Sequence, residues 1–275
     1  MKKLLLTLAL INIANVDAKE PIKITGLKTP ESVAQAEDGS IYISEINEFG
    51  KDGDGQISKV DTKGYVTVFA KGMDDPKGLV IVGDKIYVAD KTRILEVKPD
   101  GTWTVYVDAT AFPAKPQFLN DMEADKQGNL YVSDSGNLKT GGAIYKIVNG
   151  KVSTIADSSA PEIHAPNGLL FEGRNNLLEV DFDSGILYRI NLTSGKITKL
   201  ADGFGGGDGV VRTKMGKVFV SDWKNGLVFK SSAGKARTVK SGYQSAADIG
   251  LTQDGKYIMV PDMKAGELDF IPIHE

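Results

Sequence analysis

IYISE (residues 41–45), IYVAD (86–90), LYVSD (130–134), LLEVD (177–181), VFVSD (218–222) and IMVPD (258–262) are six versions of one pattern, an apolar β-rich run that ends in an acid. The six acids are spaced by 45, 44, 47, 41 and 40 residues. A turn rich in Gly, Asp or Asn precedes each run, which is typical of a β-hairpin. A period of this length indicates a repeat architecture.

Each repeat contains enough β-rich sequence for four strands. A second β-rich run follows the acid in all six repeats, as in ISKVD (57–61), and a third follows in five, as in YVTVFA (65–70). A short apolar strand before the turn completes a four-stranded antiparallel unit, the blade of a propeller. No stretch shows sustained helical periodicity, which excludes a βαβ fold. The sequence therefore predicts an all-β, six-bladed β-propeller.

The two ends of the repeat array complement each other. The sixth repeat lacks its fourth strand, whereas a spare strand, PIKITGL (21–27), precedes the first repeat. Joining the two would remove the exposed edges of an open ring. We expect the N-terminal strand to close the last blade.

The first residues predict an export signal. Lys2 and Lys3 precede an apolar run over residues 4–13, and Val16 and Ala18 form a small-residue cleavage pattern. We expect residues 1–18 to be a signal peptide and residues 19–275 to form a single propeller domain. The protein would then be periplasmic or secreted, and the Lys-Lys start favours the periplasm.

Composition excludes several classes of function. The 33 basic and 36 acidic residues are interspersed, which argues against a nucleic-acid partner, and no other apolar run is long enough to span a membrane. The sequence has no cysteine, which excludes disulfides, zinc–thiolate sites and thiol nucleophiles. We expect a monomer that acts on a small molecule.

The six recurrent acids have a structural interpretation. They occur in every repeat, whereas a functional site requires asymmetry. We expect their carboxylates to brace neighbouring blades through hydrogen bonds to backbone amides.

A different position varies around the ring. Fourteen residues before the recurrent acid, or thirteen in the second repeat, lies the start of the innermost strand at the channel mouth. Around the ring this position holds Glu31, Lys77, Asn120, Asn167, Asp208 and Asp248.

Five of these six residues offer hard oxygen ligands, which suit Ca²⁺ or Mg²⁺. Crowded carboxylates are costly unless a cation neutralises them. Lys77 would offset part of the charge or contact a substrate carboxylate. The alternative is that these residues only cap strands or form turns, as Asn-Gly at 167–168 and Asp-Gly at 208–209 would. Turn chemistry does not explain five aligned oxygen donors, so we favour a metal site.

The chain resembles the gluconolactonase/regucalcin group of six-bladed propellers, which is related to NHL-repeat proteins. The resemblance spans the mature chain and is carried by TPESVA around Glu31, FLNDM with Asn120, PNGL with Asn167 and GGGDGV with Asp208. It implies that these four residues bind a divalent cation, with Asn120 sometimes acting through water. It further implies that Asp208 is the catalytic base of a lactonase or esterase.

The resemblance leaves alternatives open. The cation would be Ca²⁺, with Mg²⁺, Mn²⁺ or Zn²⁺ as alternatives. Asp248 is a second candidate for the base, because metal ligation lowers the basicity of a carboxylate such as Asp208. Many sugar lactonases of this group have a substrate-contacting arginine where this chain has Phe118. The rival hypothesis is a non-catalytic exported propeller with a structural Ca²⁺ that binds a small ligand or a protein.

Two lesser signals remain. KDGDGQIS (51–58) resembles part of an EF-hand loop, but β-strands flank it, so a hairpin loop is favoured over a weak Ca²⁺ site. His164 lies three residues before Asn167 on a loop expected to reach the channel mouth. There it would transfer protons or contact substrate, although an isolated loop histidine is usually solvated.

Overall fold

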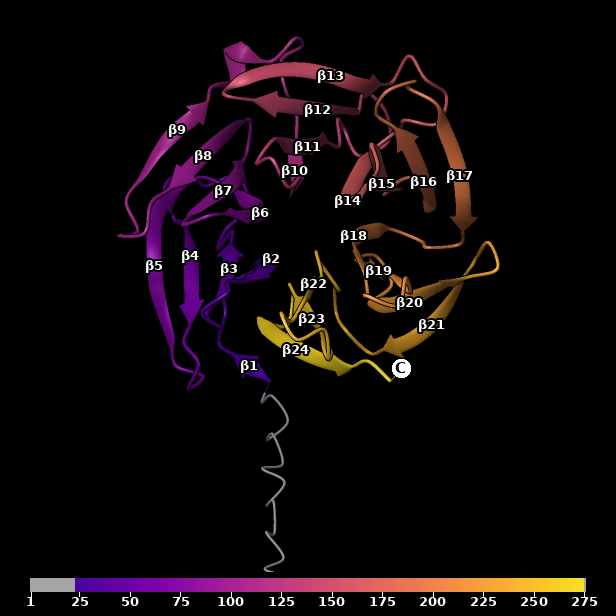
Figure 1. Cartoon of the computed structure of the whole chain (residues 1–275). Coiled ribbons are helices and arrows are strands. Elements are labelled where there is room, and N and C mark those ends of the chain that lie inside the picture. Colours follow the sequence, from indigo (N-terminus) through magenta and orange to yellow (C-terminus); the bar gives the residue numbers. More distant parts are fainter. Residues whose placement is uncertain (1–22, 275) are drawn as a thin grey trace, which may run out of the picture.

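The computed structural model describes residues 23–274, which form six four-stranded antiparallel units arranged around a central axis (Figure 1). The all-β fold predicted from the repeats is confirmed. Among the described residues, the one helical element is a 3-10 turn, η1 (Ala109–Ala111). The expected signal peptide, residues 1–18, lies outside the described residues.

Four concentric sets of strands build the six blades. The innermost strands are β2 (Pro30–Gln35), β6 (Pro76–Val82), β10 (Leu119–Ala124), β14 (Pro166–Gly173), β18 (Gly207–Arg212) and β22 (Gly250–Leu251). The second strands are β3 (Ile41–Glu45), β7 (Lys85–Asp90), β11 (Leu130–Asp134), β15 (Asn176–Asp181), β19 (Val218–Asp222) and β23 (Tyr257–Asp262). Each second strand ends at one of the recurrent acids.

The outer half of each blade follows the same order. The third strands are β4 (Gly55–Val60), β8 (Arg93–Val97), β12 (Ala143–Val148), β16 (Ile186–Asn191), β20 (Leu227–Ser232) and β24 (Glu267–Pro272). The outermost strands are β5 (Val66–Met73), β9 (Trp103–Val107), β13 (Lys151–Asp157), β17 (Ile197–Asp202), β21 (Lys235–Ser241) and β1 (Ile24–Thr25). One parallel pairing, Asp202 with Lys235, links the edges of blades four and five.

Closure of the ring follows the expected scheme. Strand β1 pairs with β24, the third strand of blade six, through Ile24–Leu268 and Thr25–Glu267. In Figure 1 the indigo N-terminal strand therefore lies beside the yellow C-terminal blade. Because β1 supplies the fourth strand of that blade, the first and last repeats are held together.

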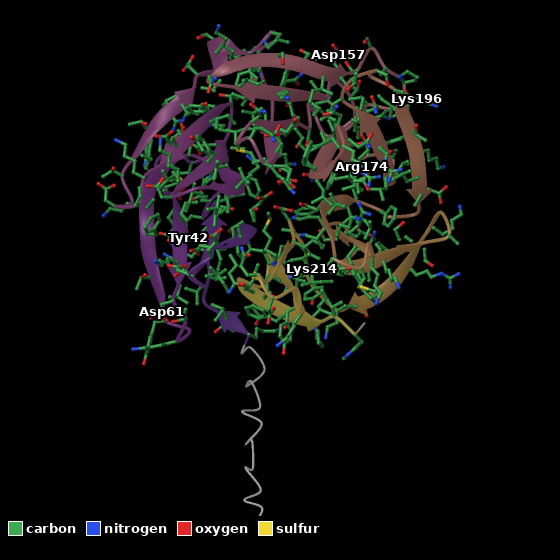
Figure 2. The ribbon with its side chains drawn as sticks, in the orientation of Figure 1. Tyr42, Asp61, Asp157, Arg174, Lys196 and Lys214 are labelled. Carbon is green, nitrogen blue, oxygen red and sulfur yellow. The ribbon has the colours of Figure 1, made fainter. Side chains whose placement is uncertain are left out.

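The core lies between neighbouring blades. Side chains lie between the blades (Figure 2). Tyr42, labelled there, packs edge-to-face on Phe69 of the same blade with ring centroids 5.0 Å apart, and both rings pack on a cluster shared with blade two. The second and third strands together carry most of this core, and β11 is buried at all five positions. Outermost strands such as β21 are largely exposed. The graded burial follows from the blade geometry, since an inner strand has blades on both faces.

Candidate metal centre at the channel mouth

The recurrent acids accept hydrogen bonds from backbone amides, as the sequence predicted. In blade three, Asp134 accepts from the amides of Gln117 and Phe118 at 2.9 and 2.8 Å. In blade six, Asp262 accepts from Gln244 and Ser245 at 2.9 and 3.0 Å. These amides belong to the segment that leads into the innermost strand of the same blade. The acids therefore anchor the connections between blades.

A two-residue β-bulge begins the innermost strands of blades one to five. In blade three, Leu119 pairs with Asp134, and the register shifts before Met122 pairs with Val132. Equivalent shifts occur in blades one, two, four and five. A bulge re-aims side chains locally, and here it gives each blade two successive residues at the axis. We call the first of these the upper ring and the second the lower ring.

The upper ring brings together five of the six predicted residues. Glu31, Lys77, Asn120, Asn167 and Asp208 line one cavity of about 280 Å³. They come from five different blades, and all five are buried.

The sixth predicted residue, Asp248, does not belong to the upper ring. Ala246 pairs with Asp262 sixteen residues later, whereas the corresponding partners in blade three, Leu119 and Asp134, are fifteen residues apart. The hairpin of blade six is thus one residue longer. Counting fourteen residues back from Asp262 therefore reaches the residue after the upper-ring position. Ala247 occupies the upper ring, and Asp248 occupies the lower ring.

The lower ring contains two acids, one serine and three glycines. Its members are Ser32, Gly78, Asp121, Gly168, Gly209 and Asp248. The blades approach closely here, and a Cβ on Gly168 would lie 2.1 Å from the carbonyl oxygen of Asp208. The Ser32 hydroxyl donates to Asp248 at 2.5 Å. Asp248 is therefore engaged below the cavity.

Three upper-ring oxygens have no hydrogen-bond partner within the described chain. They are Oε2 of Glu31, Oδ1 of Asn167 and Oδ1 of Asp208, and all three are buried. Leaving a buried polar atom without a partner costs about 1–3 kcal/mol. The Asn120 amide is oriented by its Nδ2, which donates to the Ser135 hydroxyl at 3.0 Å. The arrangement suits a cation bound by these oxygens.

The electrostatic environment of the upper ring also favours binding of a cation. Burial, with the charges of Asp208 and Asp248, raises the pKa of Glu31 well above its usual value, and Lys77 opposes this shift. Burial and Asp248 likewise raise the pKa of Asp208. A bound divalent cation would favour the charged carboxylates and lower both pKa values.

The donor set has only two carboxylates. Among residues 23–274, no group of three or more His, Cys, Asp or Glu side chains is arranged to hold a metal ion. The other two oxygen donors of the set, beside Glu31 and Asp208, are the side-chain amides of Asn120 and Asn167. Such an all-oxygen set fits Ca²⁺ or Mg²⁺ better than metals that favour nitrogen or sulfur ligands.

An apolar wall surrounds the upper ring. It consists of Ile46, Phe49, Phe118, Leu138, Phe182, Trp223 and Met263. Sequence reasoning found only Phe118 among these residues. A signal for the others was available, because Ile46, Phe182, Trp223 and Met263 each directly follow a recurrent acid. In blade three this position is Ser135, the residue that orients Asn120.

Lys77 and Phe118 contact each other in the cavity. The Lys77 ammonium lies 4.3 Å from the centroid of the Phe118 ring, a cation–π distance. Its Nζ also donates to the carbonyl of Asp75 at 3.3 Å. Burial lowers the pKa of Lys77, while Glu31 and Asp75 oppose this shift.

His164 does not reach the cavity. Its ring contacts Asp183 Oδ2 at 3.4 Å and the Pro161 carbonyl at 3.0 Å, and its side chain is 45% exposed. The preceding loop turns the imidazole outward, so a substrate contact for His164 is not supported. The EF-hand-like stretch 51–58 lies at the junction of a hairpin loop and β4, as favoured from the sequence.

Comparison with known proteins places the chain in a family. Residues 73–240 match the family model described as SMP-30/Gluconolactonase/LRE-like region. The comparison with curated proteins found no match.

Solved structures share the fold at low sequence identity. A Xanthomonas campestris gluconolactonase superposes with a TM-score of 0.73 and 16% identity, covering 90% of this chain and 89% of its own. Regucalcin from Agrobacterium tumefaciens, a calcium-binding protein, superposes with a TM-score of 0.70 and 20% identity. The match covers 86% of this chain and 82% of the regucalcin chain. A chain of a nidogen–laminin complex superposes with a TM-score of 0.66 and 21% identity. The match covers 79% of this chain and 82% of that chain. The protein described here is a six-bladed propeller that belongs to the SMP-30/gluconolactonase/LRE-like family.

Proposed function

We propose that this protein is a divalent-cation-dependent hydrolase that opens a lactone or an ester at the mouth of the propeller channel. The observation that carries this proposal is the set of three buried, unpartnered oxygens on Glu31, Asn167 and Asp208 that line one cavity. Family membership supports it, because the family includes gluconolactonases.

Glu31, Asn120, Asn167 and Asp208 would hold the cation. Their oxygens favour Ca²⁺, with Mg²⁺, Mn²⁺ or Zn²⁺ as alternatives. When bound, the cation would polarise the substrate carbonyl and stabilise the oxyanion that develops during attack.

Asp208 is the better placed of the two candidate bases. It lines the cavity, whereas Asp248 lies beneath it and accepts a hydrogen bond from Ser32. Asp208 would take a proton from the attacking water as that water adds to the carbonyl carbon. Cleavage of the carbon–oxygen bond then releases an alkoxide, and Asp208 returns the proton to it. The products are an alcohol and a carboxylic acid, which releases its proton to water and leaves as a carboxylate.

Lys77 supplies the cavity's positive charge. Its ammonium is held against Phe118, close enough to Glu31 to influence the pKa of that residue. In the proposed reaction it would contact the carboxylate product or stabilise negative charge on the leaving oxygen.

The test uses purified mature protein stripped with a chelator. Lactones and aryl esters are assayed with and without Ca²⁺, Mg²⁺, Mn²⁺ or Zn²⁺, and thermal unfolding is followed in the same samples. We expect turnover only with a cation, and a loss of about 10²–10⁴-fold in the Asp208→Ala variant. Asp248→Asn serves as the matched lower-ring control.

The outcomes separate the alternatives. Unchanged hydrolysis by Asp208→Ala would contradict the assigned base. Turnover lost in Asp248→Asn with cation binding intact would transfer the role to Asp248. No turnover with any substrate, together with cation-dependent stabilisation, would favour the non-catalytic propeller that binds a ligand or a protein.

We also propose that the protein is exported and acts as a monomer in the periplasm or outside the cell. The N-terminal pattern over residues 1–18 supports export. Among residues 23–274, no helix combines the length and apolarity that a membrane crossing requires. Cell fractionation with N-terminal sequencing, and the molar mass in solution, test these two statements. Retention of Met1 on protein confined to the cytoplasm would contradict export.

A further inference from the structure

The cavity above the upper ring is divided chemically. All its charged and amide side chains belong to the upper ring at its base. Its walls are hydrocarbon and aromatic, contributed by loops of blades one, three, four, five and six. Phe49 is 52% exposed, so its ring offers apolar surface at the opening of the cavity.

A second cavity continues this apolar surface. It measures about 590 Å³ and lies toward the junction of blades one and six, where Leu27 and Gly266 contribute to its lining. Lys28, Thr29 and Lys264 also line it, so its apolar part is the wall shared with the first cavity. Phe49, Trp223 and Met263 line both cavities, so the two adjoin. The apolar surface therefore extends from the reacting position toward one edge of the mouth.

Two lysines hold the aromatic part of this wall. The Lys264 ammonium lies 4.4 Å from the Trp223 ring centroid, and that of Lys224 lies 4.2 Å from the Phe182 ring centroid. The Trp223 indole N–H contacts the Met263 sulfur at 3.2 Å. These contacts give the wall a defined shape before a ligand arrives, which lowers the ordering cost of binding.

Such a wall disfavours a polyhydroxylated substrate. Hydroxyl groups placed against Phe49, Trp223 and Met263 would lose water without gaining hydrogen bonds from these three side chains, because the Trp223 N–H is already engaged by Met263. The polar groups nearby, on Lys28, Thr29 and Lys264, lie in the second cavity. An alkyl or aryl group in the same place would gain from burial. This contrast distinguishes sugar lactones from lactones with a hydrocarbon substituent.

We propose that the substrate is a lactone or ester carrying an apolar alkyl or arylalkyl substituent, which lies over Phe49, Trp223 and Met263. This inference rests on the proposed function, because the upper ring is taken as the reacting position. The reacting carbonyl would lie at the upper ring, and the substituent would point toward the second cavity.

The first test is a chain-length series. Cation-loaded protein is assayed with γ-lactones whose side chain increases from zero to eight carbons, and with glucono-δ-lactone. We expect kcat/KM to rise about two- to fourfold per methylene until the wall is covered. Trp223→Ala should reduce the gain per methylene, whereas Trp103→Phe, a change on outer strand β9, should preserve it. A kcat/KM that is independent of chain length, or highest for glucono-δ-lactone, would overturn the proposal.

A binding measurement separates this inference from the proposed function. In the Trp103→Phe background, Trp223 is the single tryptophan and reports on the wall by fluorescence. The protein is titrated with γ-decanolactone and with glucono-δ-lactone. A saturable response to the alkyl lactone without hydrolysis would retain the apolar site and reject the hydrolase. A response to the sugar lactone alone, or to neither, would overturn the apolar site.

Discussion

Two aspartates of blade five, fourteen residues apart in sequence, have opposite surroundings. Asp222, at the end of β19, accepts hydrogen bonds from the Gly206 amide at 2.9 Å and the Asn225 side chain at 2.7 Å. Asp208, at the start of β18, is also buried but keeps one oxygen without a partner among the described residues. A carboxylate whose partners are all backbone and side-chain donors holds the fold. A buried carboxylate with an unpartnered oxygen is suited to a ligand.

The largest expected effect comes from replacing the unpartnered member of this pair. Asp208→Asn keeps the shape of the side chain but removes the charge that, in the proposed function, would bind the cation and accept the proton. We expect kcat/KM to fall about 10²–10⁴-fold. The cation-free protein should remain as stable as wild type or become more stable, because a buried acid has been removed. Steady-state kinetics and thermal unfolding of cation-free protein check both statements.

The partnered member should behave in the opposite way. Asp222→Ala leaves the Gly206 and Asn225 amides without their acceptor, so we expect a loss of about 3 kcal/mol in unfolding free energy. Urea unfolding measures this change. Cation affinity, measured calorimetrically on the folded variant, should change less than it does in Asp208→Asn. Neutral surface substitutions change the unfolding free energy by up to about 0.5 kcal/mol, so a change no larger than this in Asp222→Ala would contradict the structural role.

The two rings also predict a pH dependence. Burial raises the pKa of Asp248 to about 6 and raises the pKa values of Glu31 and Asp208 above those of the unfolded chain. Acids with raised pKa values contribute stability below their unfolded pKa, and that stability is lost as pH rises through the folded pKa. Cation-free protein should therefore be more stable near pH 5 than near pH 8.

A cation should reverse this trend. In the proposed function it would bind the charged carboxylates, so it should stabilise the protein by about 2.7 kcal/mol at a hundredfold excess over Kd, and mainly at the higher pH. Melting curves at several pH values, with and without Ca²⁺, measure the difference. Identical pH profiles in both conditions would show that the ring carboxylates do not bind the ion.

The repeat made the fold predictable, because each blade is an independent copy of one pattern. The strand ending at Asp134 indicates its own hairpin, and the spare strand before residue 28 indicates how the ring closes. Upper-ring residues such as Asn120 were predictable for the same reason, since their distance from the recurrent acid is nearly constant. The sequence could not reveal the longer hairpin that moves Asp248 to the lower ring. That displacement depends on the pairing of Ala246 with Asp262.

The apolar wall was missed for a different reason. Trp223 and Met263 lie in loops, where apolar residues form no periodic pattern, and only their place after the recurrent acid relates them. His164 was misplaced because sequence distance from Asn167 says nothing about the direction of a side chain. Its imidazole instead contacts Asp183 and Pro161 outside the cavity.

The smallest expected effect concerns one blade that departs from the repeat. Two residues before the recurrent acid, five blades have a fully buried aliphatic residue: Ile43, Val88, Val132, Val220 and Val260. Blade four has Glu179, which is equally buried, with neither carboxyl oxygen bonded to a partner in the described chain. Burial raises the pKa of Glu179 well above its usual value, so the acid costs more stability as pH rises.

We expect Glu179→Val to stabilise the protein by about 1–2 kcal/mol near neutral pH and more at alkaline pH. Glu179→Gln, which keeps the size and the polar atoms but cannot ionise, should recover only the pH-dependent part. Urea unfolding at several pH values separates the two contributions. A loss of stability in Glu179→Val would mean that the carboxyl forms a contact essential to the packing of blade three against blade four, and that blade four departs from its neighbours for a structural reason.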